Sequence, residues 1–401
     1  MAAARTFEVH PARKEIARYL LSRGFDQPVT EAEVAPPAPV RKLAGTGTAK
    51  TKKAAFAFPD GLAPQPEPIS PAPDPSRRLP HADVVVITWT VDELAALAQV
   101  FTPGVTPTKW HRYSRGFQSK YASLIRPGAP AALSKRLGSY MPVKIGDTSV
   151  LCMKSELHLN QDGVKTGEGT ATLPVKDFFK QIISEAKPKV VLTIGTAGSV
   201  FDDFELGDVV ITRAAKFRLQ NEFRNEVWNG QVFKSDWQIP TDLMTDAQQL
   251  MKQIEPDLAE PPFGPPTKRF PHSGELGAPS PDKPDIKLEQ GARDMPEFHP
   301  ILTTDYFEYG TTANRLDHEG AAVEMGDAAL GLACSELNAP PNWAVVRNMS
   351  DPVINGDLPA KEFHLNEQTT WAVGYYTAYG KYTSTCGALA TWAVVAGLDQ
   401  M

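Results

Sequence analysis

The stretch that most constrains the fold is residues 189–212, KVVLTIGTAGSVFDDFELGDVVIT. Its first part, Val190 to Ile194, is a short apolar and β-branched run, which is typical of a buried strand. The run leads into Gly195 to Ser199, where we predict a turn whose glycines let the backbone approach a ligand closely. A second β-rich run, Val209 to Thr212, follows a polar loop. A glycine turn between strands is as often a plain turn as a ligand site, so the neighbouring motifs must decide.

Predicted strands alternate with predicted helices around this stretch. Apolar runs typical of strands lie at 83–87, 140–145, 148–154 and 343–348. Apolar residues at helical spacing predict helices at 91–100, 175–186, 323–337 and after Glu367. The alternation predicts an α/β fold with a largely parallel or mixed central sheet.

The N-terminal part of the chain has a different composition. Residues 28–80 are rich in Pro, Ala and Lys and show no hydrophobic periodicity, which is typical of a linker or a disordered segment. We therefore predict a largely disordered tail over residues 1–80 and one folded domain over residues 81–401. Within that domain, a Pro-rich insertion is predicted at about 255–300.

Composition excludes several classes of partner. The net charge of -6 argues against a nucleic-acid binder, which would carry a basic excess. The sequence contains no apolar run of about 18 residues, so we predict no membrane association. Three widely spaced cysteines, without metal-binding spacing, favour free thiols in a reducing compartment. We therefore expect a cytoplasmic protein that has no metal and no other cofactor.

Other motifs place carboxylates directly after predicted strands, where α/β folds position ligand groups. Glu93 lies in TWTVDEL (88–94), after the first strand, with Asp92 beside it as a competitor. Three further segments are ILTTDYFEYG (301–310), AAVEMGDAALG (321–331) and WAVVRNMSDP (343–352). Taken alone, an acidic residue in a first helical turn also stabilises the helix N-terminus, and Ser-Asp-Pro is an ordinary turn.

In this order, the motifs resemble those of the nucleoside phosphorylase/nucleosidase superfamily. They are most similar to the branch typified by methylthioadenosine/S-adenosylhomocysteine nucleosidase, over roughly residues 82–100, 189–225 and 301–352. The resemblance implies a three-layer αβα fold with a central mixed β-sheet, in which residues 81–401 form the catalytic domain. It also implies a homo-oligomer whose substrate is a small-molecule purine nucleoside or nucleotide.

The resemblance implies a role for each matching residue. Asp351 matches the aspartate that protonates the departing purine, and Glu93 matches the glutamate that positions the attacking water. The implied substrate-binding residues are Thr196, Ala197, Gly198, Phe307, Glu324, Met325, Asp327, Ser350 and Arg347. Among them, Phe307 matches the residue that stacks on the base, and Met325 matches the residue that packs on the ribose.

The second glutamate of the family's helix motif is missing, because Gly326 occupies its place and Asp327 follows one residue later. Asp327 could reach the ribose hydroxyls with the help of the backbone freedom of glycine. Alternatively, the missing side chain could make room for a sugar with a larger or negatively charged substituent. The second alternative is slightly favoured, because adjacent residues on a helix face different directions.

The resemblance to phosphorylases is weaker at the positions that would bind phosphate. The first loop has no arginine, and Thr193 stands about where a second arginine would be. Without arginine a phosphate dianion would be poorly held, so we predict hydrolysis. The alternatives are a purine nucleoside phosphorylase that uses other basic residues, and a non-catalytic module that senses a nucleoside or nucleotide.

Two basic groups raise the possibility of a phosphorylated substrate. They are the run from Lys109 to Arg126, and Arg213, Lys216 and Arg218 after the second strand of the opening stretch. Either group could receive phosphate, or could simply be a solvated surface.

Overall fold

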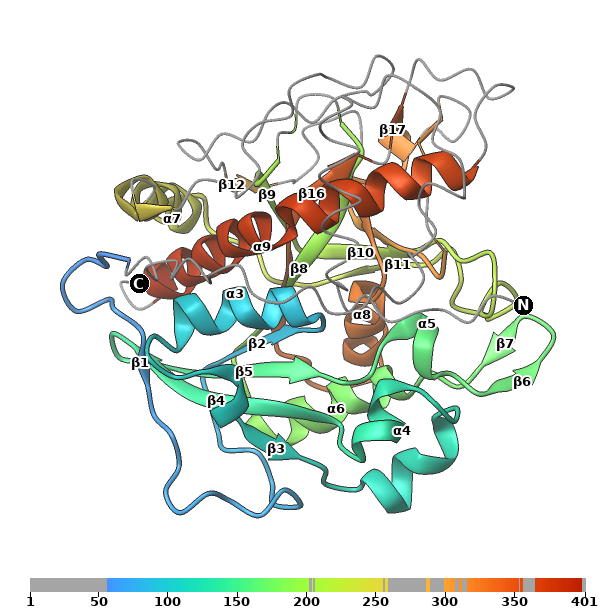
Figure 1. Cartoon of the computed structure of the whole chain (residues 1–401), viewed down its shortest axis with the longest axis horizontal. Helices are drawn as coiled ribbons and strands as arrows, with labels where there is room; N and C mark the ends of the chain where they lie inside the picture. The colour runs from blue at the N-terminus through green and yellow to red at the C-terminus, as the bar shows by residue number, and fades with distance from the viewer. Residues whose placement is uncertain are drawn as a thin grey trace, which may run out of the picture.

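The computed structural model describes residues 56–201, 204, 206–254, 257–258, 286–288, 299–306, 310–311, 316–352, 354–355 and 365–398. A mixed β-sheet forms the centre of this part of the chain (Figure 1). The predicted disorder of residues 1–55, and most of the predicted insertion at 255–300, lie outside the described residues.

The main path of the sheet runs β1-β4-β5-β2-β8-β15-β13-β10-β11, with β3 on β4, β16 on β8 and β9, and β12 on β9. Its strands are β1 (Gln65–Pro66), β2 (Val84–Thr88), β3 (His111–Tyr113), β4 (Gly138–Ile145), β5 (Thr148–Ser155), β8 (Val190–Ser199), β9 (Val209–Thr212), β10 (Ala214–Phe217), β11 (Val232–Lys234), β12 (Ile286–Leu288), β13 (Ile301–Thr303), β15 (Ala322–Glu324) and β16 (Asn342–Pro352). Two small pairs lie outside it, β6 (Lys165–Gly167) with β7 (Thr170–Ala171), and β14 (Gly310–Thr311) with β17 (Ile354–Asn355). The central strand β8 is parallel to β2 and β16 and antiparallel to β15, so the sheet is mixed.

Helices cover both faces of the sheet. The helices are α3 (Val91–Phe101), α4 (Pro130–Ser134), α5 (Leu159–Asp162), α6 (Pro174–Ala186), α7 (Thr241–Ile254), α8 (Asp327–Ser335) and α9 (Leu365–Leu398). Helix α9 packs against α3, α7 and β16 on one face, whereas α6 and α8 pack together on the other (Figure 1). Strand β2 serves both layers, because Val84 and Val86 join one apolar cluster and Val85 and Ile87 join the other. This arrangement confirms the predicted αβα fold.

The structure corrects the prediction of a glycine turn at 195–199. Strand β8 continues through Ser199, because β16 supplies a pairing partner along its whole length, including Arg347 opposite Gly195 and Asp351 opposite Gly198. The predicted helix at 323–337 is also shorter than expected. Residues Ala322–Glu324 form strand β15, which pairs with β8 and β13, and α8 begins only at Asp327.

The predicted boundary between tail and domain at residue 81 is placed too late. Strand β1 pairs with β4, the ring of Phe58 lies 4.8 Å from that of Trp392, and Leu79 is buried. The Nε1 group of Trp392 also donates a hydrogen bond to the carbonyl oxygen of Leu62. Apart from β1, this Pro-rich segment packs as irregular chain with several turns, which needs no helical or strand periodicity, so its composition resembled that of a linker.

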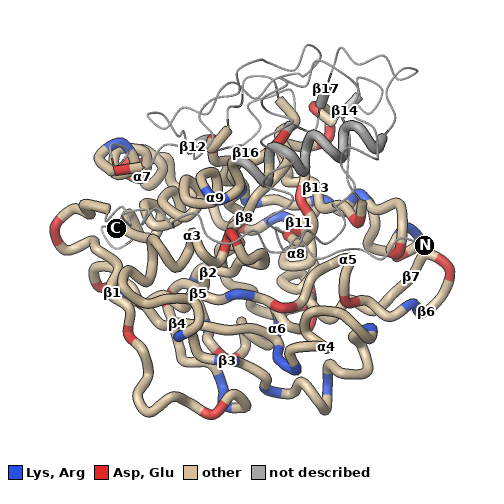
Figure 2. Tube along the Cα trace, viewed as in Figure 1, with Lys and Arg blue, Asp and Glu red and all other residues tan. Residues whose placement is uncertain are grey.

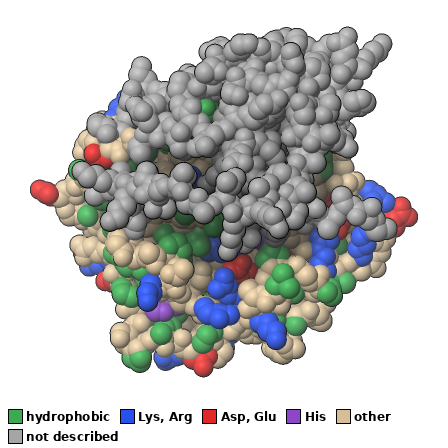
Figure 3. All heavy atoms as spheres, viewed as in Figure 1, with side chains coloured by type: hydrophobic (Ala, Val, Ile, Leu, Met, Phe, Trp, Pro, Cys, Tyr) green, Lys and Arg blue, Asp and Glu red, His purple; other side chains and the backbone are tan. Residues whose placement is uncertain are grey.

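All three cysteines are buried and free of disulfides, as their spacing predicted. Among the described helices, none is both long enough and apolar enough to cross a lipid bilayer. Figure 3 shows basic and acidic side chains interspersed with apolar ones on the described part of one face.

Candidate functional site

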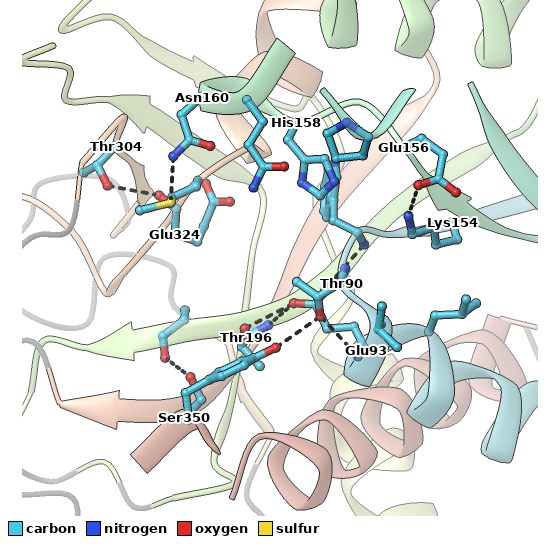
Figure 4. A pocket seen from close by; sticks show the side chains of 18 of the residues that line it. Thr90, Glu93, Lys154, Glu156, His158, Asn160, Thr196, Thr304, Glu324 and Ser350 are labelled. Atoms are coloured by element: carbon cyan, nitrogen blue, oxygen red, sulfur yellow. Dashed lines mark hydrogen bonds and ion pairs between the residues drawn. The ribbon is translucent and has the colours of Figure 1, made fainter. Parts of the chain in front are cut away.

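A cavity of about 740 Å³ opens at the carboxyl ends of the central strands. This edge of the sheet gathers side chains that are far apart in the sequence, as α/β folds do at their ligand sites. The lining residues include Trp89, Thr90, Glu93, Arg136, Lys154, Glu156, His158, Asn160, Thr196, Ala197, Gly198, Thr304, Tyr306, Glu324, Met325, Arg347, Ser350, Asp351 and Tyr376. The close-up in Figure 4 shows how several of them converge.

The carboxylate of Glu93 lies inside this cavity and is held by hydrogen bonds from two elements. Its Oε2 accepts from the hydroxyl of Thr88 and from the backbone N–H groups of Trp89 and Thr90, at 2.8–3.1 Å. Its Oε1 accepts from the backbone N–H and the hydroxyl of Thr196, at 2.9 and 3.1 Å (Figure 4). Burial opposes ionisation, but Arg347 and these N–H donors outweigh it and lower the pKa of Glu93.

Glu93 also has a structural role, because it forms the capping box that starts α3 together with Thr90. The capping interpretation and the functional interpretation of this residue are therefore compatible. Asp92, its predicted competitor, does not appear among the described residues that line the cavity.

Gly195 allows the charged groups to approach the strand closely. A Cβ atom at this position would lie 2.3 Å from Nη1 of Arg347 and 2.6 Å from Oε1 of Glu93. No other residue type leaves this space open, so the glycine supports the site by its lack of a side chain.

Arg347 lies at the centre of a buried ionic network. Its Nε and Nη2 donate to the two carboxylate oxygens of Asp327 at 2.7 and 2.6 Å, and Nη2 lies 3.2 Å from Oε2 of Glu324. The guanidinium also lies over the ring of Trp89, 5.1 Å from its centroid. Burial disfavours the charged guanidinium, but the interactions with Asp327 and Glu324 are stronger than this effect and raise the pKa of Arg347.

Glu324 shares this network with a carboxylate neighbour. Its Oε1 accepts from the hydroxyl of Thr303 and from the backbone N–H of Asp327. Burial and the charge of Asp327 raise its pKa, against the opposing effect of Arg347.

Asp351 has different surroundings. The hydroxyl oxygen of Ser350 lies 2.6 Å from Oδ1 of Asp351 and 3.3 Å from the carbonyl oxygen of Ala197. Burial raises the pKa of Asp351 to about 7, and the hydrogen bond with Ser350 opposes this shift. The cavity therefore contains one carboxyl that is kept ionised and another that is half protonated near neutral pH.

The end of β5 contributes a charged group that our sequence analysis missed. Lys154 forms a salt bridge with Glu156, and Arg136 contacts the same carboxylate through Nε and Nη2. Nearby, Asn160 donates to the sulfur of Met325. The sequence could have indicated this group, because Lys154 and Glu156 lie at the carboxyl end of a predicted strand, as Asp351 does.

The structure brings most of the predicted site residues together. Thr196, Ala197, Gly198, Glu324, Met325, Arg347, Ser350, Asp351 and Glu93 all line the cavity. Asp327 does not appear among the described lining residues, because its carboxylate is fully buried against Arg347. Phe307 lies outside the described residues, although its neighbours Thr304 and Tyr306 line the cavity.

Neither predicted basic group is found among the described residues of the cavity wall. Arg115 and Arg126 form salt bridges with Glu185 and Glu222, respectively. Figure 2 shows basic and acidic positions interspersed along the described trace. Lys216 and Arg218 both pair with Glu319.

The side-chain position of Gly326 is bordered by other groups. A Cβ atom there would lie 3.4 Å from the ring of Trp89 and 3.6 Å from Oε2 of Glu324. These are ordinary contacts, so a small side chain fits, whereas a glutamate would extend toward the indole and a second carboxyl group.

No group of three or more His, Cys, Asp or Glu side chains in the described part of the chain is arranged to hold a metal ion. No curated protein matches the sequence.

Two of the solved structures that are similar to this chain serve as comparisons. Futalosine hydrolase of Helicobacter pylori strain 26695 has a TM-score of 0.44 and 12% identity, and the match covers 79% of this chain and 97% of that one. The 5'-methylthioadenosine/S-adenosylhomocysteine nucleosidase of Neisseria meningitidis, in complex with methylthio-immucillin-A, has a TM-score of 0.42 and 15% identity, over 78% and 99% of the two chains.

The family comparison matches a defined part of the chain. A model of the phosphorylase superfamily matches residues 164–372, which is more than half of the 401 residues. The match includes β8, β15 and β16, and with them Thr196, Glu324, Arg347 and Asp351. The chain belongs to the phosphorylase superfamily.

Proposed function

We propose that this protein hydrolyses the N-glycosidic bond of a purine nucleoside or nucleotide and releases the free base and the sugar. The observation that carries the proposal is the pair of carboxyls in one cavity, Glu93 with a lowered pKa and Asp351 with a pKa of about 7. Two titratable groups whose environments push their pKa values apart are suited to separate acid and base tasks.

Asp351 is the general acid of this proposal. Cleavage leaves negative charge on the departing purine, which a protonated carboxyl beside the ring nitrogen can neutralise. Ser350 donates to Oδ1 of Asp351 at 2.6 Å, so Oδ2 can carry the proton that is donated to the substrate. Ser350 would then keep the carboxyl oriented in both of its charge states.

Glu93 positions the attacking water. Its carboxylate already accepts five hydrogen bonds, and two of these come from the rotatable hydroxyls of Thr88 and Thr196. A water can therefore bind Oε1 only by replacing the contact from the hydroxyl of Thr196, which is the longer of the two at that oxygen. Thr196 would then hold the water from its other side.

The sugar lies between these two groups in our proposal. Met325 packs on the ribose, and Glu324, with its raised pKa, donates a hydrogen bond to a ribose hydroxyl while protonated. Phe307 stacks on the base next to Tyr306, as the family resemblance implies. Asp327 acts through Arg347 and does not contact the ribose.

Hydrolysis is favoured over phosphorolysis by the surroundings of the attacking group. Thr193, at the predicted place of a phosphate-binding arginine, is fully buried, and the β2–α3 junction contributes Glu93. Arg347 is already held in a bidentate pair with the carboxylate of Asp327, which leaves little of its charge for a phosphate dianion.

A direct assay tests the proposal. We expect the full-length protein to release free base from at least one member of a panel of purine nucleosides and nucleotides in phosphate-free buffer. The reducing sugar should appear in equal amount, and Asp351→Asn should serve as the inactive control. Base release that requires phosphate would support phosphorolysis instead. Tight binding of a nucleoside without any base release would support the sensor alternative.

A further inference from the structure

The wall of the cavity formed by the end of β5 contains more positive than negative charge. A single carboxylate, that of Glu156, accepts from both cations, with Lys154 on Oε2 and Arg136 on Oε1. Two cations that share one anion leave one formal positive charge. The adjacent His158 does not add to it at neutral pH, because burial and then the charge of Lys154 lower its pKa to about 4.

The position of Lys154 is costly for a cation. Its residue is only 8% exposed, and burial lowers the pKa of its ammonium group, even though Glu156 opposes the shift. A buried charge is normally both paired and fully hydrogen-bonded. An ammonium group has three donors, and the hydrogen bond to Glu156 uses one of them. An anionic ligand in the cavity would complete this site.

The wall lines the same cavity as Glu93 and Asp351. In the view of Figure 4, Glu93 lies between Ser350 on one side and Lys154 and Glu156 on the other. Ser350 is the neighbour of Asp351, the proposed general acid. A ligand with its base at Asp351 and its sugar beside Glu93 would therefore extend toward Lys154. The cavity volume of about 740 Å³ leaves room for such a substituent, because ligand pockets span about 300–1,000 Å³.

We propose that Lys154 and Arg136 bind a phosphate group, with Glu156 holding both cations in place. The inference rests on the proposed function and adds to it the class of substrate. The phosphate has two possible sources, since it can be attached to the sugar of the substrate or be a free inorganic phosphate beside the sugar. The geometry favours attachment to the sugar, because Lys154 and Ser350 lie on different sides of Glu93.

Steady-state kinetics on the full chain test the inference. The substrates are AMP and adenosine, each with and without inorganic phosphate, and the variants are Lys154→Met and Arg136→Met. Lys176→Met is the matched control, because Lys176 pairs with Glu336 away from the cavity. Arg136 lies at the rim with a side chain 31% exposed, so its variant remains informative if Lys154→Met fails to fold.

We expect wild-type kcat/KM to be higher for AMP than for adenosine. The ratio of the two values should fall about 10- to 100-fold in Lys154→Met, mainly through KM, as for the loss of a charged hydrogen bond. Lys176→Met should leave the ratio unchanged. A rate on adenosine that rises with inorganic phosphate, together with formation of ribose 1-phosphate, would identify free phosphate as the ligand.

An unchanged ratio in both cavity variants, without dependence on inorganic phosphate, would overturn the phosphate site while leaving the proposed hydrolysis intact. If no substrate is cleaved, the proposed hydrolysis fails, and calorimetric binding of AMP and of inorganic phosphate then tests the site alone. Binding that is weakened in Lys154→Met and retained in Lys176→Met would support the site, and equal binding in all forms would refute it.

Discussion

Asp327 holds Arg347 through two parallel hydrogen bonds of 2.7 and 2.6 Å, and both side chains are buried. This bidentate pair fixes the plane of the guanidinium. The third nitrogen of the guanidinium, Nη1, donates to the carbonyl oxygen of Thr196 at 3.3 Å, on the strand that also binds Glu93. Asp327 therefore contacts Arg347, whereas a direct contact with the sugar was one of the two alternatives that the sequence left open.

We expect Asp327→Ala to destabilise the protein by about 3–5 kcal/mol, because it leaves a buried guanidinium without its main partner. Asp327→Asn, which keeps one acceptor, should be milder. Chemical denaturation measures the free energy of unfolding of each variant. A direct ribose contact would instead raise KM with little change in stability, and that result would contradict the assigned position.

Asp351→Asn should lower kcat by about 10²–10⁴-fold while leaving the fold intact, because an amide cannot deliver a proton to the leaving base. Release of free base from the best substrate measures the effect, and circular dichroism checks the fold. Near-normal turnover in a folded variant would remove Asp351 from the mechanism.

The activity should fall as the pH rises through about 7. The pKa of Asp351 is raised to about 7, so the protonated acid that the reaction needs is present below that pH and is lost above it. Glu93, with its lowered pKa, remains ionised throughout this range. A profile of kcat from pH 5 to 9 tests the expectation, and the same profile for the residual activity of Asp351→Asn should lack this decline.

Glu93→Gln should be far more damaging to turnover than Asp92→Asn. Glutamine can still accept in the capping box that starts α3, but its NH2 group would face N–H or O–H donors that now contact the second carboxylate oxygen, so stability should fall as well. Its neutral amide also binds and activates water poorly. Only Glu93 of the two lines the cavity in the described structure. A larger loss of activity in Asp92→Asn would show that Asp92 is the functional residue.

Gly195→Ala should reduce both stability and activity. The new methyl group would lie 2.3 Å from Arg347 and 2.6 Å from Glu93, so at least one of these groups must move. Overpacking of this kind costs about 1–3 kcal/mol. Gly326→Ala is the control for stability, because its nearest contact would be an ordinary 3.4 Å. Equal thermal stability of the two variants would contradict the close packing around Gly195.

The sequence by itself determined the α/β class and the family motifs. The apolar periodicity that predicted a strand at 83–87 and a helix at 175–186 is local, and the structure has β2 and α6 within one residue of these bounds. The sequence also placed Glu93 and Asp351 after strand ends, and both line one cavity because the carboxyl ends of neighbouring parallel strands meet at one edge of a sheet.

Only the tertiary structure decided what the charged side chains contact. Asp327 and Arg347 are 20 residues apart, and Lys154 shares the cavity with Glu93 although β5 and α3 are separated by β3 and β4. Strand pairing also decided the conformation of residues 195–199. Their glycine pattern predicted a turn, but pairing with β16 keeps them in strand β8. Local spacing specifies backbone elements, whereas the charge and protonation of a buried group depend on neighbours that the fold brings from distant parts of the chain.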